Sequence, residues 1–203
     1  MADIRSDKNL EFFFDFGSPN AYLAYAQLPG LLERTGARLV WRPILLGAVF
    51  KATNNQSPAM IDCTPKRDYL WRDMHRVAER HNIDFRVNDA FPLNTITLMR
   101  GAIAYLGTPH FEPYVRAIFR AMWVDNRDLG DNHQLKATLT EAGLDIANFE
   151  TQVEAEATKQ ALRDATDAAV GMGIFGAPSF LVDGELFFGQ DRLDFVEQAL
   201  TDA

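Results

Sequence analysis

Apolar and aromatic residues form a short run near the start of the chain, from Leu10 to Phe16, and their aromatic content predicts a strand. From Ala21 to Arg34, leucines recur at the spacing of an amphipathic helix. A second strand is predicted from Leu39 to Pro43. The chain therefore opens with a β-α-β unit.

The middle of the chain is predicted to be all helical, from 66 to 168. Turn-forming residues cluster from Asn54 to Pro65, and helical periodicity follows them. The segments with this periodicity are Tyr69 to Asn82, Leu93 to Leu106, Pro113 to Val124, Asn132 to Ala142 and Phe149 to Met172.

The period changes again near the C-terminal end. Gly173 to Pro178 is predicted as a loop, Ser179 to Val182 as a strand, Asp183-Gly184 as a hairpin turn, Leu186 to Phe188 as the returning strand, and Arg192 to Leu200 as a helix. This order is that of an α/β protein with a thioredoxin-like domain. We expect that domain to be discontinuous, comprising residues 10–65 and 169–203, with the all-helical subdomain of 66–168 inserted.

Composition excludes several classes of function. The 203 residues carry a formal charge of −8 and include no basic run, so we expect no nucleic-acid partner. No segment is long and apolar enough to span a bilayer, and residues 1–10 lack the apolar core of a signal peptide. We therefore expect a cytoplasmic protein without a membrane partner.

The pattern of reactive residues excludes other sites. Cys63 is the only cysteine, which rules out an intramolecular disulfide and a two-cysteine redox centre. It lies in a polar stretch without an activating signature, so we do not interpret it as a nucleophile. The four histidines show no metal-ligand spacing, so no metal is expected. Glycine-rich phosphate loops and a Gly-x-Ser-x-Gly elbow are also missing.

Ser18 is the first candidate for chemistry. It follows the aromatic strand within Gly17-Ser18-Pro19 and stands where the first helix is predicted to begin. Backbone N–H groups at a helix N-terminus lack partners and the helix dipole is positive there, so an anion such as a thiolate or a carboxylate is stabilised. Ser18 would be the first side chain that such an anion meets.

A second candidate is Ala177-Pro178, where a proline enters a strand from a loop. Such a proline can be cis, which would turn the backbone of the preceding residue outward to pair with an extended peptide; a plain loop-to-strand proline is the alternative. Gln190 and Asp191 lie between the last strand and the last helix. Asp191 could cap that helix, accept hydrogen bonds from a ligand ammonium group, or do both.

Three further residues are candidates, and two of them, Lys66 and Trp123, have two interpretations each. Asn55 and Lys66 flank the turn-rich segment, and a lysine beside the Ser18 helix would favour a carboxylate or thiolate, although a loop lysine is usually a solvated charge. Trp123 ends a predicted helix and could form an apolar wall or belong to the core.

Three motifs in this order resemble those of 2-hydroxychromene-2-carboxylate isomerases and kappa-class glutathione transferases. They are Phe14-Asp15-Phe16-Gly17-Ser18-Pro19-Asn20-Ala21-Tyr22, Phe175-Gly176-Ala177-Pro178 and Phe188-Gly189-Gln190-Asp191-Arg192-Leu193. The resemblance extends from about Glu11 to Leu200 and implies a thioredoxin-like fold with a DsbA-like helical insertion. Gly17 departs from the bulkier apolar residue that is common there in both groups.

The resemblance implies a glutathione site with Ser18 against the sulfur. It places Ala177, next to Pro178, against the cysteinyl backbone of glutathione, and Gln190 and Asp191 at the γ-glutamyl end. Asn55 and Lys66 match positions along glutathione and near the second substrate. Phe50, Phe91 and Trp123 are candidates for an apolar wall around an aromatic carboxylate substrate.

The first functional hypothesis is therefore a glutathione-dependent isomerase of bacterial aromatic degradation, homodimeric like the proteins that it resembles. It would convert 2-hydroxychromene-2-carboxylate to trans-o-hydroxybenzylidenepyruvate by reversible thiolate addition, ring opening, rotation and elimination. The alternatives are a kappa-class transferase that conjugates glutathione to electrophiles, and a non-catalytic thioredoxin-like module that binds peptides at the Ala177-Pro178 edge. A disulfide oxidoreductase is a poor fit, because Ser18 occupies the nucleophile position.

Overall fold

The computed structural model describes residues 8–202, so the expectation about a signal peptide in residues 1–10 falls largely outside the described residues. Its sheet has four strands in the order β2-β1-β3-β4. The strands are β1 (Asn9–Phe14), β2 (Arg38–Pro43), β3 (Ser179–Val182) and β4 (Glu185–Phe188). β1 and β2 are parallel, and the other two pairs are antiparallel. The predicted β-α-β opening and C-terminal hairpin are thus confirmed.

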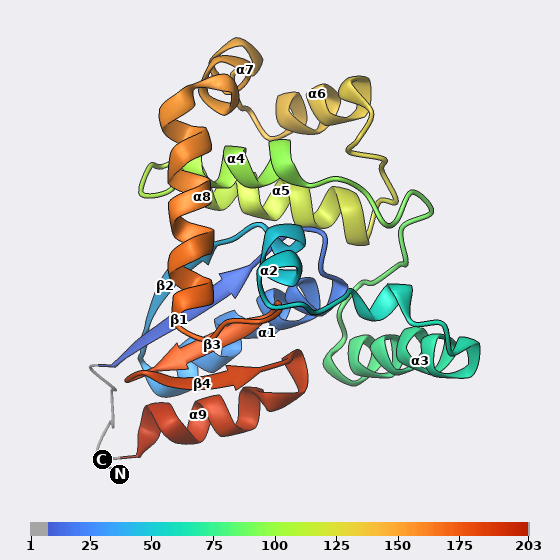
Figure 1. Cartoon of the computed structure of the whole chain (residues 1–203), viewed down its shortest axis with the longest axis vertical. Coiled ribbons are helices and arrows are strands. Elements are labelled where there is room, and N and C mark those ends of the chain that lie inside the picture. The colour runs from blue at the N-terminus through green and yellow to red at the C-terminus, as the bar shows by residue number, and fades with distance from the viewer. Residues whose placement is uncertain (1–7, 203) are drawn as a thin grey trace.

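Helices surround this sheet and form the upper part of the molecule in Figure 1. The α-helices are α1 (Pro19–Thr35), α2 (Leu46–Ala52), α3 (Thr64–His81), α4 (Ile96–Tyr105), α5 (Phe111–Trp123), α6 (Asn132–Glu141), α7 (Ile146–Glu154), α8 (Glu156–Gly171) and α9 (Leu193–Thr201). Two 3₁₀ turns, Pro58–Met60 and Gln190–Arg192, complete the description. Among the described residues, no helix combines the length and apolar character needed to cross a membrane.

Both faces of strand β1 are buried, which explains its continuous aromatic run. Phe12 and Phe14 belong to the larger core cluster with helices α1 and α5, and their rings stack at 5.4 Å between centroids. Phe13 points to the other face, where it joins a smaller cluster that includes residues of α2 and α8. Packing on both faces therefore fixes the C-terminal end of β1, and with it the position of Ser18, which follows that end.

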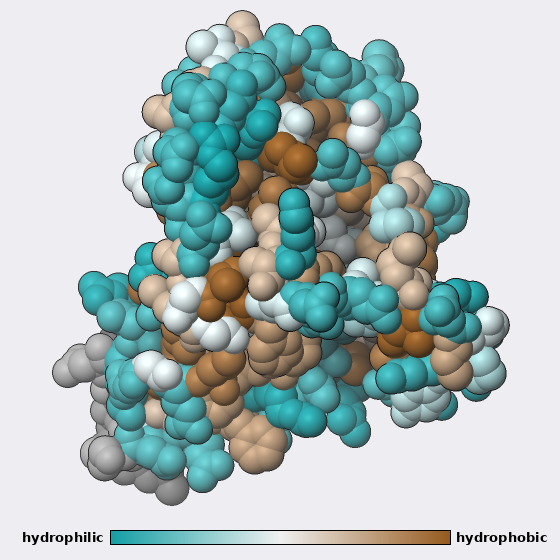
Figure 2. Space-filling view, viewed as in Figure 1, coloured by the Kyte–Doolittle hydropathy of each residue, from teal (hydrophilic) through white to brown (hydrophobic). Residues whose placement is uncertain are grey.

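Two helical predictions need correction. The periodic stretch from Phe149 to Met172 is two helices, because Ala155 takes an extended conformation (φ −59°, ψ 131°) between α7 and α8. Helix α2 was not predicted, since its seven residues contain too few turns to show a period. On the face shown in Figure 2, hydrophilic residues follow the outer side of the upper helices, and hydrophobic residues are visible between these helices and again near the middle of the molecule.

Candidate functional site

Ser18 lies at the start of helix α1 and is 5% exposed. Its Oγ accepts a hydrogen bond from the Ala21 N–H at 3.1 Å, which makes it the N-cap of the helix. The hydroxyl donates to the Ala177 carbonyl oxygen at 2.8 Å, 159 positions away in sequence. The serine therefore joins the helix N-terminus to the loop that leads into β3.

That loop presents backbone groups to the same place. The Ala177-Pro178 peptide bond is cis. The Ala177 carbonyl accepts the Ser18 hydroxyl, and no acceptor for the Ala177 N–H is found among residues 8–202. A side chain at Gly176 would displace the Phe188 ring, because a Cβ there would lie 2.7 Å from it. An extended ligand could thus pair with the Ala177 N–H.

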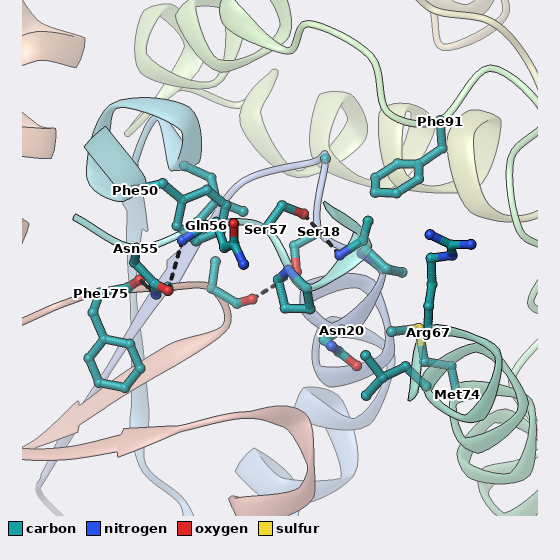
Figure 3. A pocket seen from close by; sticks show the side chains of 18 of the residues that line it. Ser18, Asn20, Phe50, Asn55, Gln56, Ser57, Arg67, Met74, Phe91 and Phe175 are labelled. Carbon is teal, nitrogen blue, oxygen red and sulfur yellow. Dashed lines mark hydrogen bonds between the residues drawn. The ribbon is translucent and has the colours of Figure 1, made fainter. Parts of the chain in front are cut away.

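A cavity of about 290 Å³ opens in front of Ser18. Residues from both ends of the chain and from the segment between α2 and α3 line it. In Figure 3, Asn55, Gln56 and Phe175 lie on one side of Ser18, and Arg67, Met74 and Phe91 lie on the other. The cavity therefore has two arms that meet at the serine.

Several residues predicted for the site line this cavity. Asn55 donates from its Nδ2 to the Phe175 carbonyl oxygen at 3.1 Å, which ties the segment after α2 to the loop before β3. Phe50, on α2, and Phe91 add half-buried aromatic rings, and Ala177 contributes its backbone. The tertiary structure thus brings together Ser18, Asn55, Phe50, Phe91 and Ala177.

Other predicted residues lie outside the cavity lining. Lys66 is exposed in the first turn of α3, and Gln190 and Asp191 lie in the 3₁₀ turn before α9. Asp191 is not the N-cap of α9, because the helix begins after Arg192; its carboxylate instead pairs with Arg192 at 3.3 Å. Pro178 is buried behind Ala177.

Trp123 belongs to the core. It is fully buried, and its Nε1–H donates to the Phe16 carbonyl oxygen at 2.8 Å. Its ring contacts Phe91, with 5.6 Å between centroids, and Phe91 is the residue of this pair that lines the cavity. Of its two interpretations, the structure therefore places Trp123 behind the cavity wall, where it holds the loop that leads to Ser18.

The side chain of Asp15 stabilises the loop that contains Ser18. Its carboxylate is 1% exposed and accepts hydrogen bonds from the Gly17 N–H at 2.9 Å and the Leu46 N–H at 2.8 Å. Burial raises the pKa of Asp15 above 3.8, while these two bonds and one from Thr95 act against the increase. One buried carboxyl group thus connects the Ser18 loop with the start of α2 and with α4.

We expect Asp15→Asn to destabilise the fold by about 1–3 kcal/mol, since its amide nitrogen would face a backbone N–H. A raised native pKa means that the native state holds the proton more tightly, so Asp15 contributes most stability below its unfolded pKa and loses it as pH rises through the native pKa. The free energy of unfolding of the wild type should therefore exceed that of Asp15→Asn by less as the pH rises. Urea unfolding of both proteins from pH 3.5 to 8 measures this difference. A difference that does not change with pH would contradict the raised pKa of Asp15.

A comparison with protein families shows to which family the chain belongs. The DSBA-like thioredoxin domain matches residues 9–201, nearly the whole sequence. The chain belongs to this family. This result confirms the fold class predicted from the order of the elements, a thioredoxin-like domain with a DsbA-like helical insertion.

Within the DsbA-like family, its relatives carry the names that the motifs suggested. The chain is 32% identical to a 2-hydroxychromene-2-carboxylate isomerase of Sphingobium xenophagum, covering 96% of this chain and 99% of that protein. It is 26% identical to the rat (Rattus norvegicus) glutathione S-transferase kappa 1, over 94% and 90% of the two chains. A solved structure of a 2-hydroxychromene-2-carboxylate isomerase superposes with a TM-score of 0.85 at 26% identity, covering 95% of this chain and 94% of the other. The resemblance read from the sequence is confirmed.

This DsbA-like chain lacks a second cysteine, and its single thiol is exposed at Cys63, just before α3. Within residues 8–202 no group of three or more His, Cys, Asp or Glu side chains is arranged to hold a metal ion. At Gly17, a Cβ would lie 3.1 Å from the Thr95 methyl group. The small residue thus leaves Thr95 close to the Ser18 loop.

Sequence reasoning missed part of the cavity lining in this DsbA-like protein. Helix α3 contributes Arg67, Leu70, Trp71 and Met74, and the hairpin contributes Phe188. The α3 residues recur at positions i, i+3, i+4 and i+7, which is one face of a helix. That spacing is visible in the sequence. The one sign that this face lines a binding cavity is an arginine among apolar residues.

Proposed function

We propose that this protein is a glutathione-dependent isomerase that converts 2-hydroxychromene-2-carboxylate to trans-o-hydroxybenzylidenepyruvate in bacterial aromatic degradation. One observation carries the proposal: the Ser18 hydroxyl, at the N-terminus of α1, meets the Ala177 backbone at the mouth of an aromatic-lined cavity. The names of the relatives support the reaction class.

The residues fit glutathione, an extended anionic tripeptide. The Ala177 N–H, without an acceptor among residues 8–202, suits its peptide backbone, and Asn55 lies along the same arm of the cavity. Lys66, Gln190 and Asp191 lie outside the lining, and we assign them to the charged ends of the tripeptide. When bound, glutathione supplies a thiol whose thiolate form adds reversibly to a conjugated double bond and so permits rotation.

Ser18 would favour the thiolate. A free thiol with a pKa of about 8.5 is mostly protonated at neutral pH, and a hydrogen bond to sulfur at a helix N-terminus lowers that pKa. The Ser18 hydroxyl donates to the Ala177 oxygen in the structure. Once a ligand N–H occupies that oxygen, the hydroxyl is free to rotate and donate to the sulfur while its oxygen still caps Ala21.

The aromatic rings would hold the second substrate. Phe50 and Phe91 present half-buried faces to the cavity, and Trp123 supports Phe91 from the core. An aromatic ring packed there would displace water from the region in front of Ser18. Trp123 contributes to this wall only by holding Phe91 in place.

A kappa-class transferase activity is the second candidate, favoured by the rat relative. The same Ser18 site would then activate glutathione for conjugation to an electrophile, and glutathione would be consumed. A non-catalytic peptide-binding module would need the Ala177 edge but not the apolar arm of the cavity. The cytoplasmic location expected from the composition and the homodimeric state implied by the resemblance stay predictions.

The experiment that tests the proposal follows the ultraviolet spectrum of 2-hydroxychromene-2-carboxylate with the protein, with and without glutathione. We expect conversion to the benzylidenepyruvate only when glutathione is present, and no loss of glutathione in a thiol assay. Glutathione binding by calorimetry without conversion, but with conjugation of a model electrophile, would support the transferase. If glutathione does not bind, both enzymatic functions are wrong.

A further inference from the structure

One face of helix α3 forms the arm of the cavity opposite Asn55. The residues on this face are Arg67, Leu70, Trp71 and Met74. Met74 is 8% exposed and, with Ala78 further along α3, belongs to the main core cluster, which sets the rotation of the helix. Arg67 therefore faces the cavity, whereas Lys66, its neighbour in sequence, lies outside the lining and is exposed.

Arg67 is the one charged residue among the described residues that line this cavity. No carboxylate within residues 8–202 forms an ion pair with it. Within residues 8–202 the Arg67 side chain makes one hydrogen bond, a long one from Nη1 to the Ile61 carbonyl oxygen at 3.5 Å. The half-buried guanidinium thus keeps most of its five donors for another group.

The surroundings of Arg67 are aromatic. In Figure 3 its guanidinium extends toward Phe91. Trp71 and Phe91 meet edge to face, with 5.6 Å between ring centroids. An apolar arm that contains a single unpaired cation suits a flat, apolar molecule with one negative charge.

We propose that Arg67 binds the carboxylate of the aromatic second substrate, and that Trp71 and Phe91 hold its ring. This assignment rests on the proposed function and makes Arg67, rather than Lys66, the specificity-determining cation. The planar fork of arginine matches a carboxylate in a bidentate geometry, and a point-charge ammonium does not. Because Ser18 stands between the two arms, a substrate held by Arg67 would present its reactive carbons toward the sulfur site.

The test compares Arg67→Met and Arg67→Lys with Arg72→Met, which removes the same charge from an exposed position of α3 outside the cavity lining. Calorimetry measures three dissociation constants: those of trans-o-hydroxybenzylidenepyruvate, of its methyl ester and of glutathione. We expect Arg67→Met to weaken binding of the acid about 10- to 100-fold, the loss of a charged hydrogen-bonded pair. Arg67→Lys should fall in between, and Arg72→Met should match the wild type.

Binding of the ester and of glutathione shows whether Arg67 recognises the substrate carboxylate specifically. Both should bind Arg67→Met within about twofold of the wild type, because neither uses the cation. A larger loss for glutathione than for the acid would overturn the assignment, as would equal effects of Arg67→Met and Arg72→Met. Thermal melting confirms that the variants fold. If the wild type binds the acid through Arg67 but does not isomerise the chromene, the proposed function is wrong and the carboxylate site stands.

Discussion

Ser18→Ala is expected to lower kcat/KM for the glutathione-dependent reaction by about 10- to 100-fold, the loss of one hydrogen bond to a charged sulfur. Without the hydroxyl, the pKa of the bound thiol rises, so the remaining activity should increase with pH over a range where the wild type has reached its plateau. Steady-state kinetics from pH 6 to 9.5 measure both effects.

The variant also loses an N-cap and a buried donor to the Ala177 oxygen. We therefore expect about 1 kcal/mol less stability from the cap alone. Asp145→Ala is the matched control, because Asp145 caps α7 by accepting from the Asn148 N–H at 3.0 Å and does not line the cavity. It should lose similar stability and keep its activity. Equal kcat/KM values for Ser18→Ala and the wild type would exclude the role proposed for the serine.

Trp123→Ala is expected to destabilise the protein by about 3–5 kcal/mol, the usual cost of emptying a fully buried tryptophan site. Such a loss is a large part of the ~5–15 kcal/mol that stabilises an ordinary domain. Trp41→Ala, at a half-buried position on β2, should cost less. Urea unfolding measures both changes.

Trp123→Phe removes the hydrogen bond of Trp123 and keeps part of its packing. A phenyl ring is retained in place of the larger indole, and the Phe16 carbonyl loses its donor, so we expect a loss of about 1–3 kcal/mol. Because Phe16 leads into the Ser18 loop, kcat should fall with little change in the KM of the aromatic substrate. A selective rise in that KM would show instead that Trp123 touches the substrate.

Local signals explain the predictions that the structure confirms. The aromatic run before Gly17-Ser18-Pro19 ends where the chain leaves the sheet, and the N-cap serine starts the helix within four residues. Asp183 and Gly184 both have positive φ, as a two-residue hairpin requires. The break at Ala155 has no glycine or proline to mark it, so the periodicity continued through it.

Such local signals do not predict which side chains face the cavity. Lys66 and Arg67 are neighbours of the same charge, and successive residues of a helix point about 100° apart. Their roles depend on which face of α3 packs on the core, and Met74 and Ala78 decide this through contacts with distant elements. Whether Trp123 is a wall or core depends in the same way on Phe91 and on the Phe16 loop.

The sequence by itself determined the order of strands and helices, the junction at Ser18 and the membership in a DsbA-like family, because each follows from residues close together or from motifs kept in order. Only the tertiary structure decided that Ser18 meets Ala177, that Arg67 faces the cavity and that Trp123 lies behind it. These relations depend on the packing of segments that are distant in the chain, and the periodicity of one segment does not specify how it is rotated against another.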